Sequence, residues 1–121
     1  MKPSDDLMAW LGPAADELTP EQIERVTAEA RAIAERYPDP DEQPERDAAL
    51  SAVVQYLLGE TTPEDAAHEL SSARLREQRA FAAATWMAVM LVRDNPVRYK
   101  AVAAQRAGID RMSLLKALGE R

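Results

Sequence analysis

At 121 residues, the chain has the length of one domain that can bury a hydrophobic core without disulfides or metal ions. It contains no cysteine and a single histidine, which excludes disulfides, thiolate metal sites and cysteine catalysis and leaves little material for an enzyme. Gly, β-branched and aromatic residues are scarce while Ala and Leu are abundant, and this composition predicts an all-α fold.

The net charge of −6 conceals a strong asymmetry along the chain. Residues 1–70 carry 5 Lys and Arg against 17 Asp and Glu, a net charge of −12, whereas residues 71–121 carry 10 against 4, a net charge of +6. A chain divided in this way can present a basic face to phosphate and an acidic face to another partner, or its halves can neutralise each other within the fold. The charge pattern alone therefore names no partner.

Residues 1–43 are expected to form an acidic helical region that ends in a linker. The start of the chain, MKPSDDLMAW, has one Lys and no apolar core of signal-peptide length, so the cytoplasm is the default compartment. Thr19-Pro20-Glu21-Gln22 has the residues of a capping box, and a helix with one apolar stripe should follow it as far as Tyr37. The acidic, proline-rich segment 38–44 is the best candidate for the linker.

Residues 44–94 are expected to supply the core helices. A helix is predicted from Pro44 or Glu45 to Leu58, with Gly59 as its stop. A shorter helix should run from Pro63 to about Leu70 and contribute Ala66, Ala67 and Leu70 to the core. The two serines that follow, at positions 71 and 72, either cap the next helix or lie within a continuous one.

The longest apolar run is AFAAATWMAVMLV, residues 80–92, in which Thr85 is the only polar side chain. A helix that is apolar on every face is usually surrounded by protein, and thirteen residues are well short of the roughly 20 that a membrane span needs. We therefore expect a central helix that begins near Ser72, ends before Pro96 and buries Trp86 and Met90. With Met87, the same side chains also suit the contact between two subunits of a homodimer.

Residues 95–121 carry the only pattern that points to an activity. Ala103-Ala104 provides small residues in a first short helix, Gly108-Ile109 provides a tight turn with an apolar plug, and Asp110 through Leu118 provides a capped second helix with an apolar inner face. Two short helices joined by such a turn form a helix-turn-helix, whose second helix can enter the major groove of DNA.

The string AAQRAGIDRMSLLKALG resembles helix-turn-helix DNA-binding proteins, particularly small actinobacterial ones that close on an Ala-Gly-hydrophobic-Asp-Arg-Met-Ser/Thr sequence. The resemblance covers about Asn95 to Gly119. It implies a recognition helix whose outward residues are Arg111, Met112, Leu115 and Lys116, and it implies phosphate contacts by Arg98, Lys100 and Arg106. Two outward residues of this helix are apolar, which permits contact with a thymine methyl group but not the bidentate hydrogen bonds of direct base recognition. Asp110 also places a negative charge where phosphate would approach.

Other patterns give no functional site. GETTPEDAAHELSSARLREQR has a helix, a break and a helix, but it lacks a glycine in the turn and is best explained as ordinary helical packing. His68-Glu69 begins like a His-Glu-x-x-His zinc motif, yet position 72 is serine. The acidic run 39–47 lacks the spacing and glycine of an EF-hand. We therefore predict no catalytic, metal or cofactor site.

Together these patterns predict one compact all-α domain over residues 1–121, with about five to six helices around a central apolar helix and a C-terminal helix-turn-helix. The favoured function is DNA binding, associated with transcription, by a cytoplasmic homodimer. The alternative is a non-enzymatic interaction module, of the adaptor or antitoxin kind, that binds another protein through its acidic N-terminal helices. Neither function requires a cofactor or a membrane.

Overall fold

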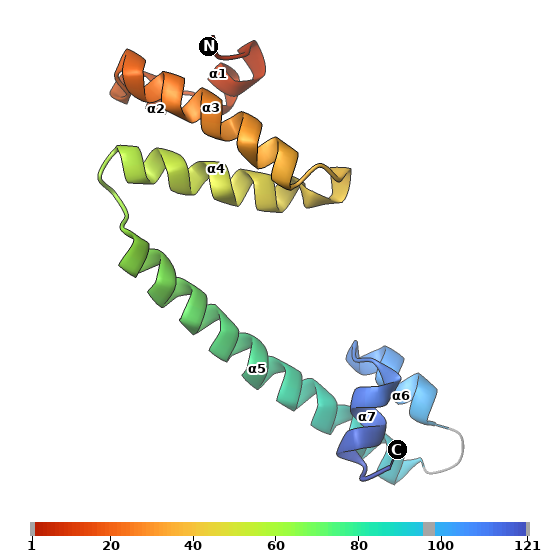
Figure 1. The fold of residues 1–121 in the computed structure, drawn as a ribbon. Helices are drawn as coiled ribbons and strands as arrows, with labels where there is room; N and C mark the ends of the chain where they lie inside the picture. The colour runs from red at the N-terminus through yellow and green to blue at the C-terminus, as the bar shows by residue number, and fades with distance from the viewer. Residues whose placement is uncertain (1, 96–98, 121) are drawn as a thin grey trace. The chain divides into compact units, whose positions relative to one another are not determined.

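The computed structural model describes residues 2–95 and 99–120. In these two ranges the chain forms seven α-helices and one 3-10 helix and no strand, which confirms the all-α prediction. Figure 1 shows the order of these helices along the chain. The chain divides into two compact units, Met1–Ala66 and Ala67–Arg121, here called the N-terminal unit and the C-terminal unit. The prediction that the whole chain is one domain stays a prediction.

The N-terminal unit begins with two short helices, α1 (Asp5–Leu11) and α2 (Ala14–Glu17), and continues into the longer α3 (Pro20–Arg36). The capping box predicted at the start of α3 is present. Thr19 Oγ1 accepts a hydrogen bond from the Gln22 N–H at 3.2 Å, and Gln22 Oε1 accepts one from the Thr19 N–H at 2.8 Å. These two bonds satisfy backbone donors that a helix start otherwise leaves without partners.

The segment that was expected to be a linker is a short structured connection between two helices. Residues Pro40–Glu42 form the 3-10 helix η1, which leads directly into α4 (Gln43–Leu57). The Arg46 guanidinium donates hydrogen bonds to the backbone carbonyls of Tyr37 and Asp39, and so ties α4 to the end of α3. The linker prediction was wrong because it relied on proline and acidic composition. Composition does not show that the Arg46 guanidinium binds the backbone of Tyr37, nine residues earlier.

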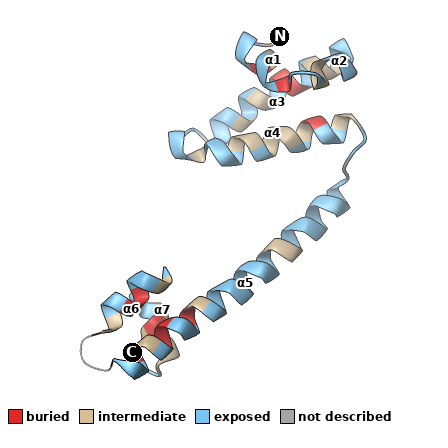
Figure 2. Ribbon diagram, turned by 180° about the vertical axis from the view of Figure 1, so that it is seen from behind, coloured by how far each residue is buried: buried red, intermediate tan, exposed pale blue. Residues whose placement is uncertain are grey.

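Helices α3 and α4 pack side by side in both views of the ribbon (Figures 1 and 2). Gln22 Nε2 donates to the Leu57 carbonyl at 3.0 Å, which joins the start of α3 to the end of α4. The hydrophobic core of this unit lies where α1, α3 and α4 meet, and its buried members are Leu7, Leu11, Leu18, Val26 and Val54. The predicted apolar stripes of α3 and α4 are thus confirmed as the inner faces of one packed pair.

Helix α5 (Pro63–Asp94) is continuous over 32 residues, or about 48 Å at 1.5 Å per residue. Ser71 and Ser72 therefore lie within it, and the separate short helix predicted from Pro63 to Leu70 was wrong. No Gly or Pro interrupts the sequence between Pro63 and Asn95, so no residue of that kind breaks the backbone hydrogen bonds of the helix. The prediction that Ala66, Ala67 and Leu70 face the core was also wrong, because all three are exposed. Of the helices in the described residues, none combines the length and apolarity needed to cross a membrane.

The C-terminal unit packs α6 (Lys100–Ala107) and α7 (Arg111–Ala117) against the last turns of α5. Figure 2 shows that the buried part of α5 lies near its C-terminal end. The core consists of Ala88, Val89, Val92, Ala103, Ala104 and Leu114.

The prediction that Trp86 and Met90 are buried was wrong. Trp86 is 51% exposed and Met90 is 44% exposed. Within the C-terminal unit, α6 and α7 cover one side of α5 only. Around the helix, Met90 lies about 160° and Trp86 about 120° from Val92, so both point away from that side. The apolar run is therefore not surrounded by its own unit.

Candidate nucleic-acid interface

The turn between α6 and α7 adopts the conformation that the sequence predicted. Gly108 has φ 72° and ψ 27°, a left-handed conformation that costs glycine nothing and strains other L-residues. The Ile109 N–H donates to the Ala104 carbonyl at 3.0 Å, which satisfies one of the last carbonyls of α6. The three residues Gly108, Ile109 and Asp110 thus join α6 to α7.

Asp110 caps the start of α7. Its Oδ2 accepts a hydrogen bond from the Ser113 N–H at 2.9 Å, and its Oδ1 accepts one from the Ser113 hydroxyl at 2.5 Å. The Ser113 hydroxyl, followed by the Ser113 N–H, lowers the pKa of Asp110 below its usual value of 3.8, because both stabilise the carboxylate form. The carboxylate of Asp110, which the sequence placed near an approaching phosphate, is therefore hydrogen-bonded to the first turn of α7.

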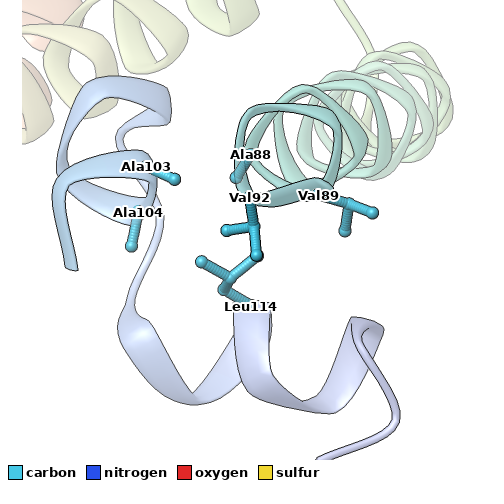
Figure 3. Packing of buried hydrophobic residues seen from close by; sticks show 6 residues of the cluster. All are labelled: Ala88, Val89, Val92, Ala103, Ala104 and Leu114. Carbon is cyan, nitrogen blue, oxygen red and sulfur yellow. The ribbon is translucent and has the colours of Figure 1, made fainter. Parts of the chain in front are cut away.

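Helices α5, α6 and α7 contribute side chains to one buried cluster. Figure 3 shows Leu114 of α7 directed at Val92 of α5, while Ala103 of α6 faces Ala88. Ala103 and Leu114 are completely buried. A pair of short helices is marginal alone, so this shared core is what holds α7 in place.

The outward side of α7 carries most of the residues predicted to meet DNA. Arg111 and Lys116 are exposed, and Met112 is 65% exposed. Leu115 is half-buried, so it lies at the border of this surface. Met112, Ser113, Lys116 and Glu120 line a shallow hollow of about 380 Å³. The exposed surface is mixed in character, with one apolar, one acidic and two basic long side chains.

The basic residues predicted to contact phosphate are not equivalent. Lys100 Nζ lies 2.5 Å from Glu120 Oε2, so its charge is compensated by a carboxylate after the end of α7. Arg106 Nη1 donates to the Tyr99 hydroxyl at 3.1 Å, and it retains a guanidinium edge on the exposed side of α6. The predicted contact of Arg98 lies outside the described residues.

Glu120 and Tyr99 were missed at the level of sequence. Glu120 binds Lys100, which is 20 positions away in the sequence, and Tyr99 accepts a hydrogen bond from Arg106, which is 7 positions away. Sequence spacing of three or four predicts side-chain pairs within one helix, but both of these pairs link residues that do not share a helix. Only the fold of the turn brings Glu120 to Lys100.

Two further features lie outside this surface. A hollow of about 260 Å³ lies between α3 and α4, lined by Arg25, Glu29, Ala52, Val53, Tyr56 and Leu57. His68 is exposed on α5, and the described residues contain no group of three or more His, Asp or Glu side chains arranged to hold a metal ion.

The chain matches no protein-family model, no curated protein and no solved structure. The fold and its side chains are therefore the basis on which a function can be assigned.

Proposed function

We propose that the C-terminal unit is a helix-turn-helix that binds double-stranded DNA, with α7 as the recognition helix, in a non-enzymatic protein associated with transcription in the cytoplasm. The observation that carries the proposal is the turn. Gly108 in the left-handed conformation and Asp110 as the cap of α7 hold two short helices over one apolar core, and the outward side chains of α7 stay exposed. This is the arrangement that allows a helix to enter the major groove.

The charge of the unit supports the same proposal. Residues 67–121 carry 10 Lys and Arg against 5 Asp and Glu, a net charge of +5, whereas residues 1–66 carry 5 against 16, a net charge of −11. A basic unit is attracted to phosphate, because neutralising phosphates releases the cations condensed on the DNA. The acidic unit disfavours DNA and leaves the C-terminal unit as the binding part.

The exposed residues take different roles in this proposal. Arg111, at the start of α7, reaches the base edges, since the first residues of a recognition helix lie deepest in the groove. Met112 meets a thymine methyl group. Lys116 and Arg106 contact phosphates, and Lys100 contributes less than either, because Glu120 already compensates its charge.

A salt titration tests the proposal. The affinity of the full chain for a mixed-sequence duplex is measured at several salt concentrations, for the natural protein and for Arg106→Ala and Lys116→Ala. Each substitution should reduce the slope of log affinity against log salt by about one unit, the contribution of one phosphate contact. Arg31→Ala is the matched control, because it removes an exposed arginine from α3 in the other unit and should leave the slope unchanged.

One observation favours a second function, in which the N-terminal unit binds another protein. The hollow between α3 and α4 exposes the Tyr56 ring beside Arg25 and Glu29, and an aromatic ring with mixed charges around it is typical of a protein-binding surface. In that case the natural protein binds no duplex even at low salt, and Tyr56→Ala abolishes binding of the protein partner.

A further inference from the structure

The outer side of α5 in the C-terminal unit carries four small or apolar residues, here called the outer stripe: Ala83, Trp86, Met87 and Met90. All four are exposed. At 3.6 residues per turn, the outer stripe lies on the side opposite the buried residues Ala88, Val89 and Val92. A contiguous run of large apolar side chains on one exposed helical face marks an interaction site.

We propose that a second copy of this chain covers the outer stripe, with the two α5 helices antiparallel about a two-fold axis at the level of Thr85. The proposal goes beyond DNA binding and does not depend on it. The choice of a second copy rests on the self-complementarity of α5 in charge and in side-chain size. The choice of direction rests on the positions of Arg76 and Asp94.

The charge argument concerns Arg76 and Asp94. They are eighteen residues apart, which is five complete helical turns, so both lie on the same line along one edge of the outer stripe. Thr85 is midway between them. A two-fold axis at that level therefore sets Arg76 against Asp94 of the second copy, and symmetry repeats the pair at the other end of the contact.

Asp94 gains from such a partner. It lies in the last turn of α5, where a negative charge is unfavourable next to the carbonyl end of the helix dipole. Within its own chain, Arg76 forms an exposed ion pair with Glu69 at 3.2 Å, and a guanidinium has five N–H donors, so it can bind a second carboxylate.

The size argument concerns the middle of the contact. Trp86 lies one residue from the proposed axis, so the two copies of its ring meet across that axis in an aromatic pair. Met90 then inserts above Ala80 and Ala83 of the second copy, where small side chains leave a recess between neighbouring turns. Large residues thus meet small ones, and the axis brings the tryptophans together.

The parallel arrangement is disfavoured by charge. In a parallel pair in register, Arg76 and Asp94 of the second copy would stay eighteen residues apart along the helix axes, about 27 Å, which is too far for an ion pair. In the antiparallel pair Arg76 meets an aspartate instead.

The proposal is tested by the mass of the full chain in solution, measured by sedimentation at micromolar concentration. The natural protein should have twice the mass of the 13.4 kDa chain. Trp86→Glu should give the monomer. Phe81→Glu is the matched control, because Phe81 is 48% exposed on the same helix but lies about 140° around it from Trp86, and this variant should stay dimeric.

A charge exchange tests the register. Asp94→Arg should weaken the dimer by about tenfold or more, since each end of the seam then sets arginine against arginine. Combining it with Arg76→Asp restores opposite charges at both ends and should recover most of the lost affinity. Recovery by the double variant also shows that Asp94→Arg had not simply unfolded the protein.

Cross-linking tests the direction. Because the chain has no cysteine, each introduced cysteine is the sole thiol. A mixture of Arg76→Cys and Asp94→Cys proteins should form the mixed dimer with a short bis-maleimide, whereas Asp94→Cys alone should stay uncoupled. A monomeric natural protein, a dimer that survives Trp86→Glu, a double charge exchange without recovery, or coupling of Asp94→Cys to itself would each overturn the proposal.

Discussion

Lys100 Nζ and Glu120 Oε2 lie 2.5 Å apart, an ion pair that joins the start of α6 to the residues after α7. Both side chains are partly exposed, so the pair adds little stability of its own. Its consequence is electrostatic. Glu120 neutralises one cation of the basic unit and also lines the hollow beside Met112 and Lys116.

Replacing Glu120 should therefore strengthen DNA binding. In Glu120→Gln, Lys100 is released to contact phosphate, so affinity for a mixed-sequence duplex should rise and the salt slope should steepen by about one unit. Glu77→Gln removes the same charge from an exposed position on α5 and is the matched control. Equal effects of the two substitutions on affinity and slope would mean that only net charge matters and that the position of Lys100 does not.

The start of α7 should be sensitive to acid. The folded pKa of Asp110 is lower than its unfolded value, so its contribution to stability is present above the unfolded pKa and is lost as pH falls through the folded pKa. Ser113→Ala removes the hydroxyl that contributes most to this shift, so the pKa of Asp110 should rise. Titration of the Asp110 carboxyl followed by NMR measures both values. An unchanged pKa in Ser113→Ala would contradict the hydrogen bond between the two side chains.

The turn should tolerate asparagine better than valine at position 108. An added Cβ at Gly108 meets no atom of residues 2–95 or 99–120 within 4 Å, so the cost of a substitution comes from the positive φ. Gly108→Val should lower the free energy of unfolding by about 1–3 kcal/mol, whereas Gly108→Asn should lower it by less, because asparagine enters the left-handed region more easily. Denaturant unfolding of both variants measures the difference, and equal losses would show that φ is not the cause.

Thr85 should be replaceable by valine with a gain in stability. Its Oγ1 is buried and has no hydrogen-bond partner among the residues that the structure describes, which costs free energy relative to an apolar group of the same shape. Thr85→Val should raise the free energy of unfolding by about 1 kcal/mol. Thr27→Val is an informative contrast, because the Thr27 hydroxyl donates to the Ile23 carbonyl at 2.8 Å and its loss should bring no such gain.

The local signals of this sequence predicted local structure well. The capping residues Thr19, Gln22 and Asp110 make the hydrogen bonds that their spacing indicated, and Gly108 ends α6 in the left-handed conformation. Each of these features is decided by the chemistry of a few neighbouring residues, so tertiary contacts have little opportunity to override it.

Two of the incorrect predictions, the burial of Trp86 and Met90 and that of Ala66, Ala67 and Leu70, concern what a helix packs against. An apolar run indicates that a helix is covered by other side chains, but it does not show how many of its faces are covered within its own unit. Trp86 and Met90 were assigned to the core because every face was assumed to be covered. The same limit applies to the candidate site. The resemblance to helix-turn-helix proteins placed Met112 and Lys116 on the outward side of α7, whereas the pairing of Lys100 with Glu120 depends on how the turn folds α6 against α7.

The measurement that tests DNA binding by α7 most directly is an NMR titration of the isotope-labelled full chain with a short mixed-sequence duplex at low salt. If α7 is the recognition helix, the largest changes in amide chemical shift should lie within Arg106–Lys116, and the amides of α3 and α4 should stay unchanged. Raising the salt concentration should reverse these changes, because the contacts with phosphate weaken. Changes centred on α3 and α4, or no changes at a molar excess of duplex, would contradict the proposed function.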